Sequence, residues 1–213
     1  MSERPRFRDR HDAGRRLSRE LEHYRGRGDV VVLGLPRGGV PVAYEVAGAL
    51  GVPLDVFVVR KLGVPGHEEL AMGAIASGNV RVLNEDVVAA TGVEPPDLER
   101  VTARELKTLI AHERAFRGER PAIDVRDRTA IVVDDGLATG ATMRAAVTAL
   151  RELDAARIVV AVPTAPRESC ESLRRLADEV ICATTPDPFM AVGLWYADFA
   201  PVSDAEVREL LAG

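Results

Sequence analysis

The sequence is poor in cysteine and in lysine. Its 213 residues include two cysteines, Cys170 and Cys182, which are too few for a disulfide framework or, alone, for a structural zinc site. A reducing cytoplasm is therefore the expected compartment. Lys61 and Lys107 are the only lysines among the 28 basic residues, so a lysine beside a loop stands out in this chain.

Long hydrophobic runs are absent as well. No apolar run approaches the ~20 residues that cross a bilayer, and the first residues lack the hydrophobic segment of a secretory signal, so we expect no membrane partner. The net charge is −5, and we therefore expect no nucleic-acid partner for the whole chain. Residues 1–28 are rich in arginine, so mutation of these arginines would test that expectation.

Short apolar segments alternate with helical patterns along the chain, which is 46% hydrophobic. Apolar segments without polar alternation, separated by helices, predict a mainly parallel sheet with helices on both faces. We therefore predict an α/β fold in a single domain, residues 1–213. The predicted strands are 30–34, 54–59, 129–133, 157–162 and 180–183, with residues 80–83 in a hairpin. The predicted helices are 12–25, 41–50, 95–117, 142–153, 167–177 and one from about 204.

One motif stands at the end of a predicted strand: residues 130–142 read AIVVDDGLATGAT. The backbone N–H groups of the small-residue loop and the following helix N-terminus suit a phosphate. Asp134 and Asp135 would repel a phosphate, but they suit a vicinal diol whose hydroxyls donate to carboxylate oxygens. Together these features describe a site for a 5-phosphoribosyl group. The alternative is an aspartate pair that caps a helix at a surface turn. No lysine follows Gly140 and no GxGxxG is present, so other phosphate loops fit less well.

This motif resembles the phosphoribosyl pyrophosphate (PRPP) signature of the type I phosphoribosyltransferases, and weaker similarity extends over about residues 30–185. LATGATM is closest to the adenine phosphoribosyltransferase version. Gly136 departs from the family, which usually has an aliphatic residue there. The resemblance implies that the aspartate pair binds the ribose hydroxyls and the loop binds the 5-phosphate. The implied PRPP ligands here are Asp134, Asp135, Gly136, Leu137, Ala138, Thr139, Gly140, Ala141 and Thr142.

Two other loops add basic groups. Residues 35–39 (LPRGG) resemble the pyrophosphate loop of xanthine-guanine enzymes, which often holds a cis peptide before its basic residue, here Pro36–Arg37. Pro36, Arg37, Gly38 and Gly39 are the implied pyrophosphate contacts; the alternative is an ordinary glycine-rich turn. Arg60 and Lys61 follow the second strand, as in the adenine enzymes, before a flexible lid at about 60–79. The alternative for this pair is a solvated basic surface.

The family transfers the phosphoribosyl group through an oxocarbenium-like state with release of pyrophosphate. The resemblance therefore implies a cytoplasmic, Mg²⁺-dependent transferase of nucleotide metabolism that uses PRPP and a small nitrogenous acceptor, as a homodimer. The implied catalytic residues are Asp134, Asp135, Arg37 and Lys61. The two aspartates would contact the metal indirectly.

The acceptor is left open by the sequence. Enzymes for 6-oxopurines carry an acid where this chain has Ala138, and adenine enzymes carry a lid glutamate where it has Ala76. Neither proton-transfer group is present, although His67, Glu68 or Glu69 could substitute. A PRPP-binding regulator with little turnover is therefore the second hypothesis, and a phosphate-sugar hydrolase is a distant third.

Four of the few aromatic residues gather near the C-terminus. We expect residues 184–202 to form a small hood, in which Phe189 and Trp195 stack on a planar acceptor. The alternatives are a hydrophobic plug and a dimer contact.

Overall fold

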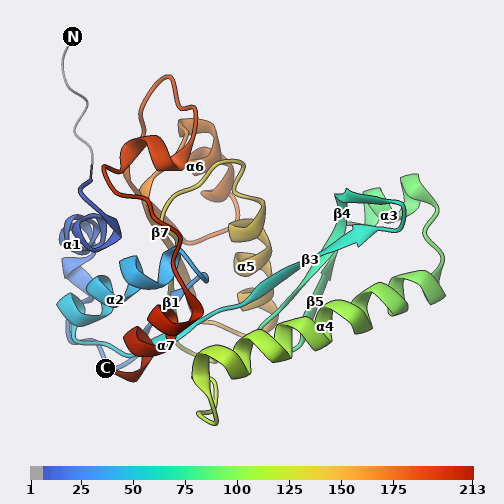
Figure 1. The fold of residues 1–213 in the computed structure, drawn as a ribbon, viewed down its shortest axis with the longest axis horizontal. Coiled ribbons are helices and arrows are strands. Elements are labelled where there is room, and N and C mark those ends of the chain that lie inside the picture. Colours follow the sequence, from blue (N-terminus) through green and yellow to red (C-terminus); the bar gives the residue numbers. More distant parts are fainter. Residues whose placement is uncertain (1–6) are drawn as a thin grey trace.

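The computed structural model describes residues 7–213, which form a five-stranded sheet and a separate three-stranded sheet (Figure 1). The five strands are all parallel, in the order β2-β1-β6-β7-β8. Their bounds are β1 (Val30–Gly34), β2 (Leu54–Val56), β6 (Thr129–Val133), β7 (Arg157–Thr164) and β8 (Glu179–Thr184). Every residue of β1 and β6 is buried, which explains why these strands lack polar alternation.

Helices cover both faces of this sheet, so the predicted fold class is confirmed. α1 (Arg10–Glu20), with a 3-10 turn at Glu22–Tyr24, and α2 (Gly39–Leu50) pack on one face. α5 (Ala141–Glu152) and α6 (Arg167–Leu173) pack on the other. Each layer buries its apolar side chains against the strands, which is the main stabilising contribution to this architecture.

The three-stranded sheet forms an arm that extends away from the main body (Figure 1). It is antiparallel, in the order β3-β4-β5, with β3 (Val59–Val64), β4 (His67–Ala76) and β5 (Val80–Leu83). The expected hairpin at 80–83 is present, but residues 60–76 form strands rather than an irregular segment. The predicted strand 54–59 is likewise divided between β2 and β3.

Two helices complete the arm, namely α3 (Glu85–Thr91), which the sequence did not predict, and α4 (Pro95–Arg117), whose bounds match the prediction. Buried Arg117 at the end of α4 joins the arm to the body. Its Nε donates to Asp55 Oδ1 at 2.7 Å and its Nη2 donates to the Val56 carbonyl at 2.7 Å. Glu113 accepts from Arg117 Nη1 at 3.0 Å.

The C-terminal segment crosses back over the body and contains a 3-10 helix (Val192–Trp195) and α7 (Asp204–Ala212). Phe7 pairs with it, because Phe7 N donates to the Trp195 carbonyl and Ala197 N donates to the Phe7 carbonyl, both at 2.8 Å. None of the helices formed by residues 7–213 is long and apolar enough to cross a membrane.

Candidate phosphoribosyl site

Two loops lie side by side at the carboxyl edge of the parallel sheet. β1 and β6 are neighbours, with Gly34 opposite Val133, and Leu35 N donates to the Val133 carbonyl at 2.9 Å. The loop after β1 therefore begins next to Asp134. Ligands bind at this edge of open parallel sheets, and the structure brings Gly38 and Gly39 together with Asp134 and Asp135 there.

Gly38 and Gly39 lie directly against the aspartate pair. A Cβ on Gly38 would stand 2.0 Å from Asp135 Oδ2, and one on Gly39 would stand 2.8 Å from the Asp134 Cα. Any side chain at either position would therefore collide with the pair. The peptide between Pro36 and Arg37 is cis, as the resemblance implied.

The two carboxylates are close to each other and mostly covered. Asp134 Oδ1 accepts from the Asp135 backbone N–H at 2.8 Å, and Asp135 Oδ2 accepts from Arg10 Nε at 2.8 Å. Burial raises the pKa of Asp134 well above its usual range, and the neighbouring charge of Asp135 raises it further. Burial also raises the pKa of Asp135, although Arg10 opposes that rise. The pair is therefore suited to ligand groups that donate hydrogen bonds or carry positive charge.

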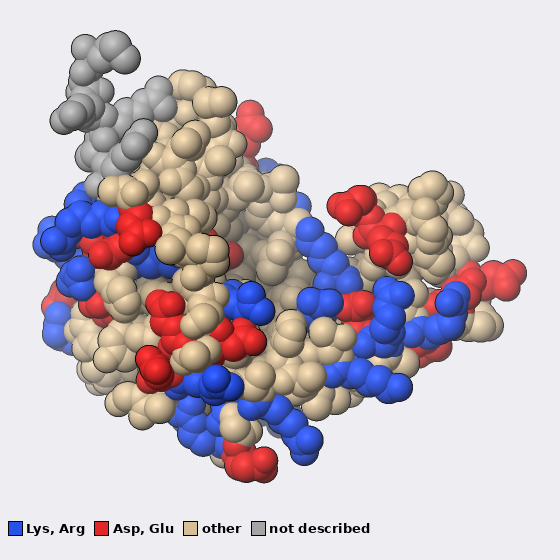
Figure 2. Space-filling model, in the orientation of Figure 1, with Lys and Arg blue, Asp and Glu red and all other residues tan. Residues whose placement is uncertain are grey.

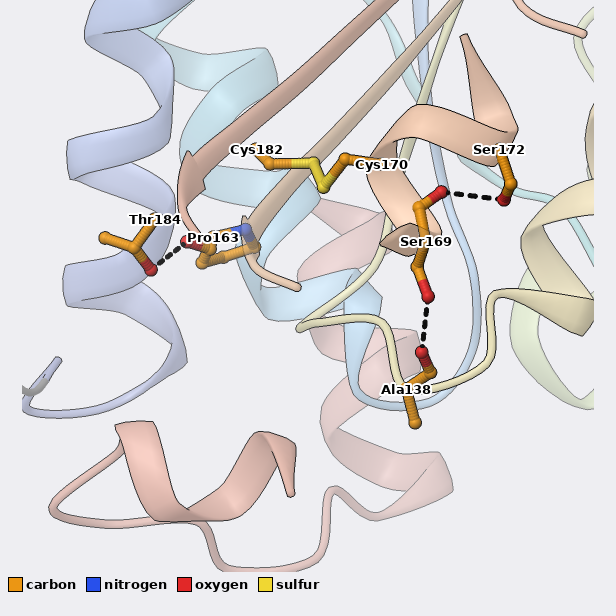
Figure 3. The surroundings of a disulfide bond; sticks show 7 residues. All are labelled: Ala138, Pro163, Ser169, Cys170, Ser172, Cys182 and Thr184. Atoms are coloured by element: carbon orange, nitrogen blue, oxygen red, sulfur yellow. Dashed lines mark hydrogen bonds between the residues drawn. A yellow bond between two sulfur atoms is a disulfide. The ribbon is translucent and has the colours of Figure 1, made fainter. Parts of the chain in front are cut away.

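The loop after the pair is held by Ser169 of α6 (Figure 3) and by the end of β7. Ser169 Oγ donates to the Ala138 carbonyl at 2.7 Å, and Leu137 N donates to the Thr164 carbonyl at 3.0 Å. Ala138 and Thr139 are exposed, and Gly140, with φ of +70°, precedes α5. The backbone of this loop is therefore fixed on its inner side and open on its outer side, as phosphate binding requires.

Comparison with known proteins agrees with this geometry. The family model for the phosphoribosyl transferase domain matches residues 8–196. The chain belongs to the phosphoribosyl transferase family. Predicted membership of the type I phosphoribosyltransferases is thereby confirmed.

Two curated relatives come from Mycobacterium tuberculosis: "Putative phosphoribosyl transferase MT0597" of strain CDC 1551 and "Putative phosphoribosyl transferase Rv0571c" of strain H37Rv. Each is 49% identical over 205 residues, which is 96% of this chain and 46% of the relative. The chain thus spans about half the length of these relatives. The solved structure of TT1426 from Thermus thermophilus is 43% identical, with a TM-score of 0.86 over 97% of each chain.

Residues 184–202, the predicted hood, lie directly on the signature loop. A Cβ on Gly136 would stand 2.5 Å from Val192 Cγ1 and 3.1 Å from the Thr164 carbonyl oxygen. Tyr196 also donates its hydroxyl to the Asp135 carbonyl. Gly136 therefore departs from the family pattern because Val192 occupies the space in which an aliphatic side chain would lie.

The basic residues expected at the pyrophosphate are separated. Arg37 is exposed, and its Nε donates to Asp204 Oδ1 at 2.6 Å, so it points toward α7. Arg60 is paired with Glu105 of α4, at 2.8 Å. Lys61 lines an open cavity of about 220 Å³ together with Ala141 and Arg144. Of these three side chains, Lys61 is thus the one that shares a cavity with the end of the signature loop. Figure 2 shows that this face is hollowed between body and arm, with basic side chains along the hollow.

The aromatic residues of the hood form a cluster. Trp195 is 6% exposed and packs with Phe7, Ala13 and Tyr196. Phe189 stacks against Trp195 with ring centroids 6.5 Å apart, and it is half-buried. Trp195 thus lies as the plug alternative describes, whereas Phe189 keeps part of its ring open to a ligand.

Sequence reasoning missed two features of the site. Arg10, which contacts Asp135, was visible only as one of many arginines in residues 1–28. The second is a disulfide between Cys170 of α6 and Cys182 of β8 (Figure 3). Their small number excluded a framework of several bridges, but one bridge needs only two cysteines that the fold brings together.

The residues fit a metal ion that a phosphorylated ligand brings with it. Residues 7–213 contain no group of three or more His, Cys, Asp or Glu side chains that could hold a metal by themselves. Asp134 and Asp135 nevertheless offer carboxylate oxygens beside a phosphate-type loop. Mg²⁺ is commonly bound through one or two carboxylates, waters and substrate phosphates in this way.

Proposed function

We propose that the chain transfers the 5-phosphoribosyl group of PRPP to a nitrogenous acceptor with release of pyrophosphate. One observation carries this proposal: the Asp134–Asp135 pair lies against the Gly38–Gly39 turn at the edge of the sheet and leads directly into the anchored loop 136–142. A diol, a 5-phosphate and a pyrophosphate on one ligand match these three parts.

Each part has a role in this proposal. The aspartate pair accepts hydrogen bonds from the ribose hydroxyls, and the backbone N–H groups of residues 137–142 hold the 5-phosphate. Residues 36–39 hold the pyrophosphate, which leaves from the anomeric carbon as the acceptor nitrogen bonds to that carbon. Arg37 must release Asp204 to join the pyrophosphate, and Lys61 reaches the ligand from the arm, which then acts as a lid.

Mg²⁺ is included in the proposal, because its charge stabilises a leaving pyrophosphate. Asp134 and Asp135 would contact it through water or through the ribose hydroxyls. We further propose a homodimer, which is the state that the family resemblance implies and which light scattering would test.

We propose the hood as the acceptor surface. Met190 is 80% exposed and Leu194 is 49% exposed, close in sequence to half-buried Phe189. A planar ring placed there would cover apolar surface. Trp195, stacked behind Phe189, would report such binding through its fluorescence rather than contact the ring itself.

Calorimetric titration of PRPP, with and without Mg²⁺, tests the donor site. We expect saturable, Mg²⁺-sensitive binding that the double substitution Asp134→Asn and Asp135→Asn abolishes without loss of fold. Absence of binding at millimolar PRPP would contradict the proposal. A matched control is Asp127→Asn, a change at an exposed turn outside the site.

A PRPP-binding regulator is the second candidate. The position of the adenine enzymes' lid glutamate is Ala76, which is 1% exposed in β4, and Ala138 offers no carboxyl. His67, Glu68 and Glu69 lie at the β3–β4 turn, beside α3 at the outer end of the arm (Figure 1). Measuring pyrophosphate release with PRPP and a panel of bases separates the two candidates. A transferase releases pyrophosphate with its acceptor base, whereas a regulator binds PRPP and releases no pyrophosphate with any base.

A further inference from the structure

Arg10 links three parts of the molecule at the candidate ribose site. It is the first residue of α1, and its side chain is 11% exposed. Its Nε donates to Asp135 Oδ2 at 2.8 Å, and its Nη1 donates to the Ala200 carbonyl at 2.7 Å. The guanidinium carbon stands 4.0 Å from the centroid of the Phe199 ring. The guanidinium group is therefore fixed by the hood on one side and by the carboxylate on the other.

We propose that Arg10 is the positioning residue for ribose recognition, acting through Asp135. The inference rests on the proposed function, since it assigns a role within the same site. Arg10 does not itself need to touch the ligand. By donating to Asp135 Oδ2, Arg10 leaves Oδ1 to accept a hydrogen bond from the ligand, and it keeps the carboxylate in place.

The distribution of contacts on the aspartate pair supports this role. Asp134 Oδ1 accepts from the Asp135 backbone and Asp135 Oδ2 accepts from Arg10. Within residues 7–213, no hydrogen bond from another residue reaches Asp134 Oδ2 or Asp135 Oδ1. One free oxygen on each of two adjacent carboxylates matches a diol, whose two hydroxyls each donate one hydrogen bond.

The charge of Arg10 matters for the same reason. Two neighbouring carboxylates repel each other, and the repulsion grows as water is excluded by a ligand. A guanidinium group held by three contacts counters that repulsion without a change in its own position. It also lies beside Gly38, with its Nε 3.3 Å from the position of a Cβ there, but its hydrogen bonds go to Asp135 and Ala200 and not to the Gly38–Gly39 turn.

A purely structural role is the competing explanation, because Arg10 also fastens the hood through Phe199 and Ala200. The two explanations differ in ligand selectivity. If Arg10 only supports the hood, its loss should weaken the binding of every ligand of the site to the same extent. A residue that acts through Asp135 affects ligands with the ribose diol and spares those without it.

The test is a calorimetric comparison of PRPP, ribose 5-phosphate and pyrophosphate on Arg10→Gln, Asp135→Asn and the double variant. We expect Arg10→Gln to weaken PRPP and ribose 5-phosphate by about 10- to 100-fold, the usual effect of losing a hydrogen bond to a charged group. Pyrophosphate affinity stays within about twofold. The double variant binds PRPP no more weakly than Asp135→Asn alone, because both changes interrupt the same contact.

Equal weakening of all three ligands, or additive losses in the double variant, would overturn the inference. The matched control is Arg15→Gln, which removes an arginine of the same helix paired with Glu45, and it should leave all affinities unchanged. If Arg10→Gln does not fold, Arg10→Lys and Phe199→Leu serve instead, and each should give a smaller loss with the same selectivity.

Wild-type protein that binds no PRPP would overturn the proposed function and this inference together. Wild-type binding with no effect of Arg10 would overturn this inference alone.

Discussion

Gly136 shows how one residue of a shared motif is set by its neighbours in this chain. The family usually has an aliphatic side chain there, and here Val192 of the hood fills that space, with Cγ1 2.5 Å from the position of a Cβ. A glycine at this point allows the hood to lie on the signature loop. The residue and the hood therefore form one packing unit.

We predict that Gly136→Ala destabilises the protein by about 1–3 kcal/mol, as overpacking of a close contact does. At this chain length that corresponds to a fall in Tm of a few degrees. Adding Val192→Ala should restore part of the loss, since it removes the nearest atom. Scanning calorimetry of the single and double variants checks this. A double variant less stable than both single variants would contradict the coupling.

Asp134 illustrates a conflict between binding and stability. Burial raises its pKa, so the folded state binds a proton more readily than the unfolded state. Stability is therefore lost as pH rises through the interval between the usual carboxyl value and the raised one. Above the usual carboxyl value, burial of this group therefore opposes folding.

We predict that Asp134→Asn raises stability at pH 7 by about 1 kcal/mol, within the range of stabilising changes at functional sites, while abolishing PRPP binding. Asparagine keeps the acceptor for the Asp135 N–H. The gain should shrink as the pH is lowered toward 3, where the wild-type carboxyl is protonated. Melting curves recorded with a chelator at several pH values would show this. A loss of stability at pH 7 would contradict it.

At the scale of elements, β1, β6, α4 and the start of α7 agree with the sequence-based boundaries, because each is decided by a local pattern. The arm was not predicted as a sheet. Its strands β3 and β4 pair Val59 with Ala76, a long-range contact with no trace in local periodicity. Arg37 illustrates the same limit in the site, since its partner Asp204 lies in the last helix. The aspartate pair and its loop could be proposed as a site from the sequence because they are contiguous.

The attachment of α4 depends on Arg117, which is 9% exposed and contacts Asp55, Val56 and Glu113. We predict that Arg117→Met lowers the free energy of unfolding by about 3–5 kcal/mol, because it leaves two carboxylates without their shared cation. Urea denaturation measures the loss. Arg100→Met, at an exposed pair on the same helix, is the control and should cost under about 1 kcal/mol.

The disulfide joins α6 to β8 behind the signature loop. Closing a loop of this size typically contributes about 2–3 kcal/mol, and Ser169 beside Cys170 holds the Ala138 carbonyl. We predict that a reductant lowers the Tm of the wild type by several degrees and does not change that of Cys182→Ser. Equal responses of the two proteins would show that the bridge is not formed in solution.

For the whole molecule, pH acts on carboxylates in several separate interfaces. The pKa values of Asp12, Glu105, Asp178 and Glu179 all lie below their usual ranges. Burial acts against this lowering at each of them, and hydrogen bonds and nearby arginines outweigh burial. Their ion pairs lie within α1, between α4 and β3, and between β7 and its neighbours. Together these groups therefore report on the fold rather than on the site.

We predict that stability falls as the pH decreases from about 5 toward 3, because carboxylates with lowered folded pKa values stabilise the protein only while they are ionised. The slope should be shallower in Glu105→Gln, which has one such group fewer and is also less stable at neutral pH through the loss of its pairs with Arg60 and Arg104. Chemical denaturation at each pH gives the slope directly. The sign of the stability change at neutral pH separates these groups from Asp134, because Glu105→Gln should lower stability and Asp134→Asn should raise it. A wild-type stability that is constant or increases on acidification would contradict the role given to the carboxylates with lowered pKa values. In that case Asp134 and Asp135, whose pKa values are raised, would dominate the response of the molecule to acid.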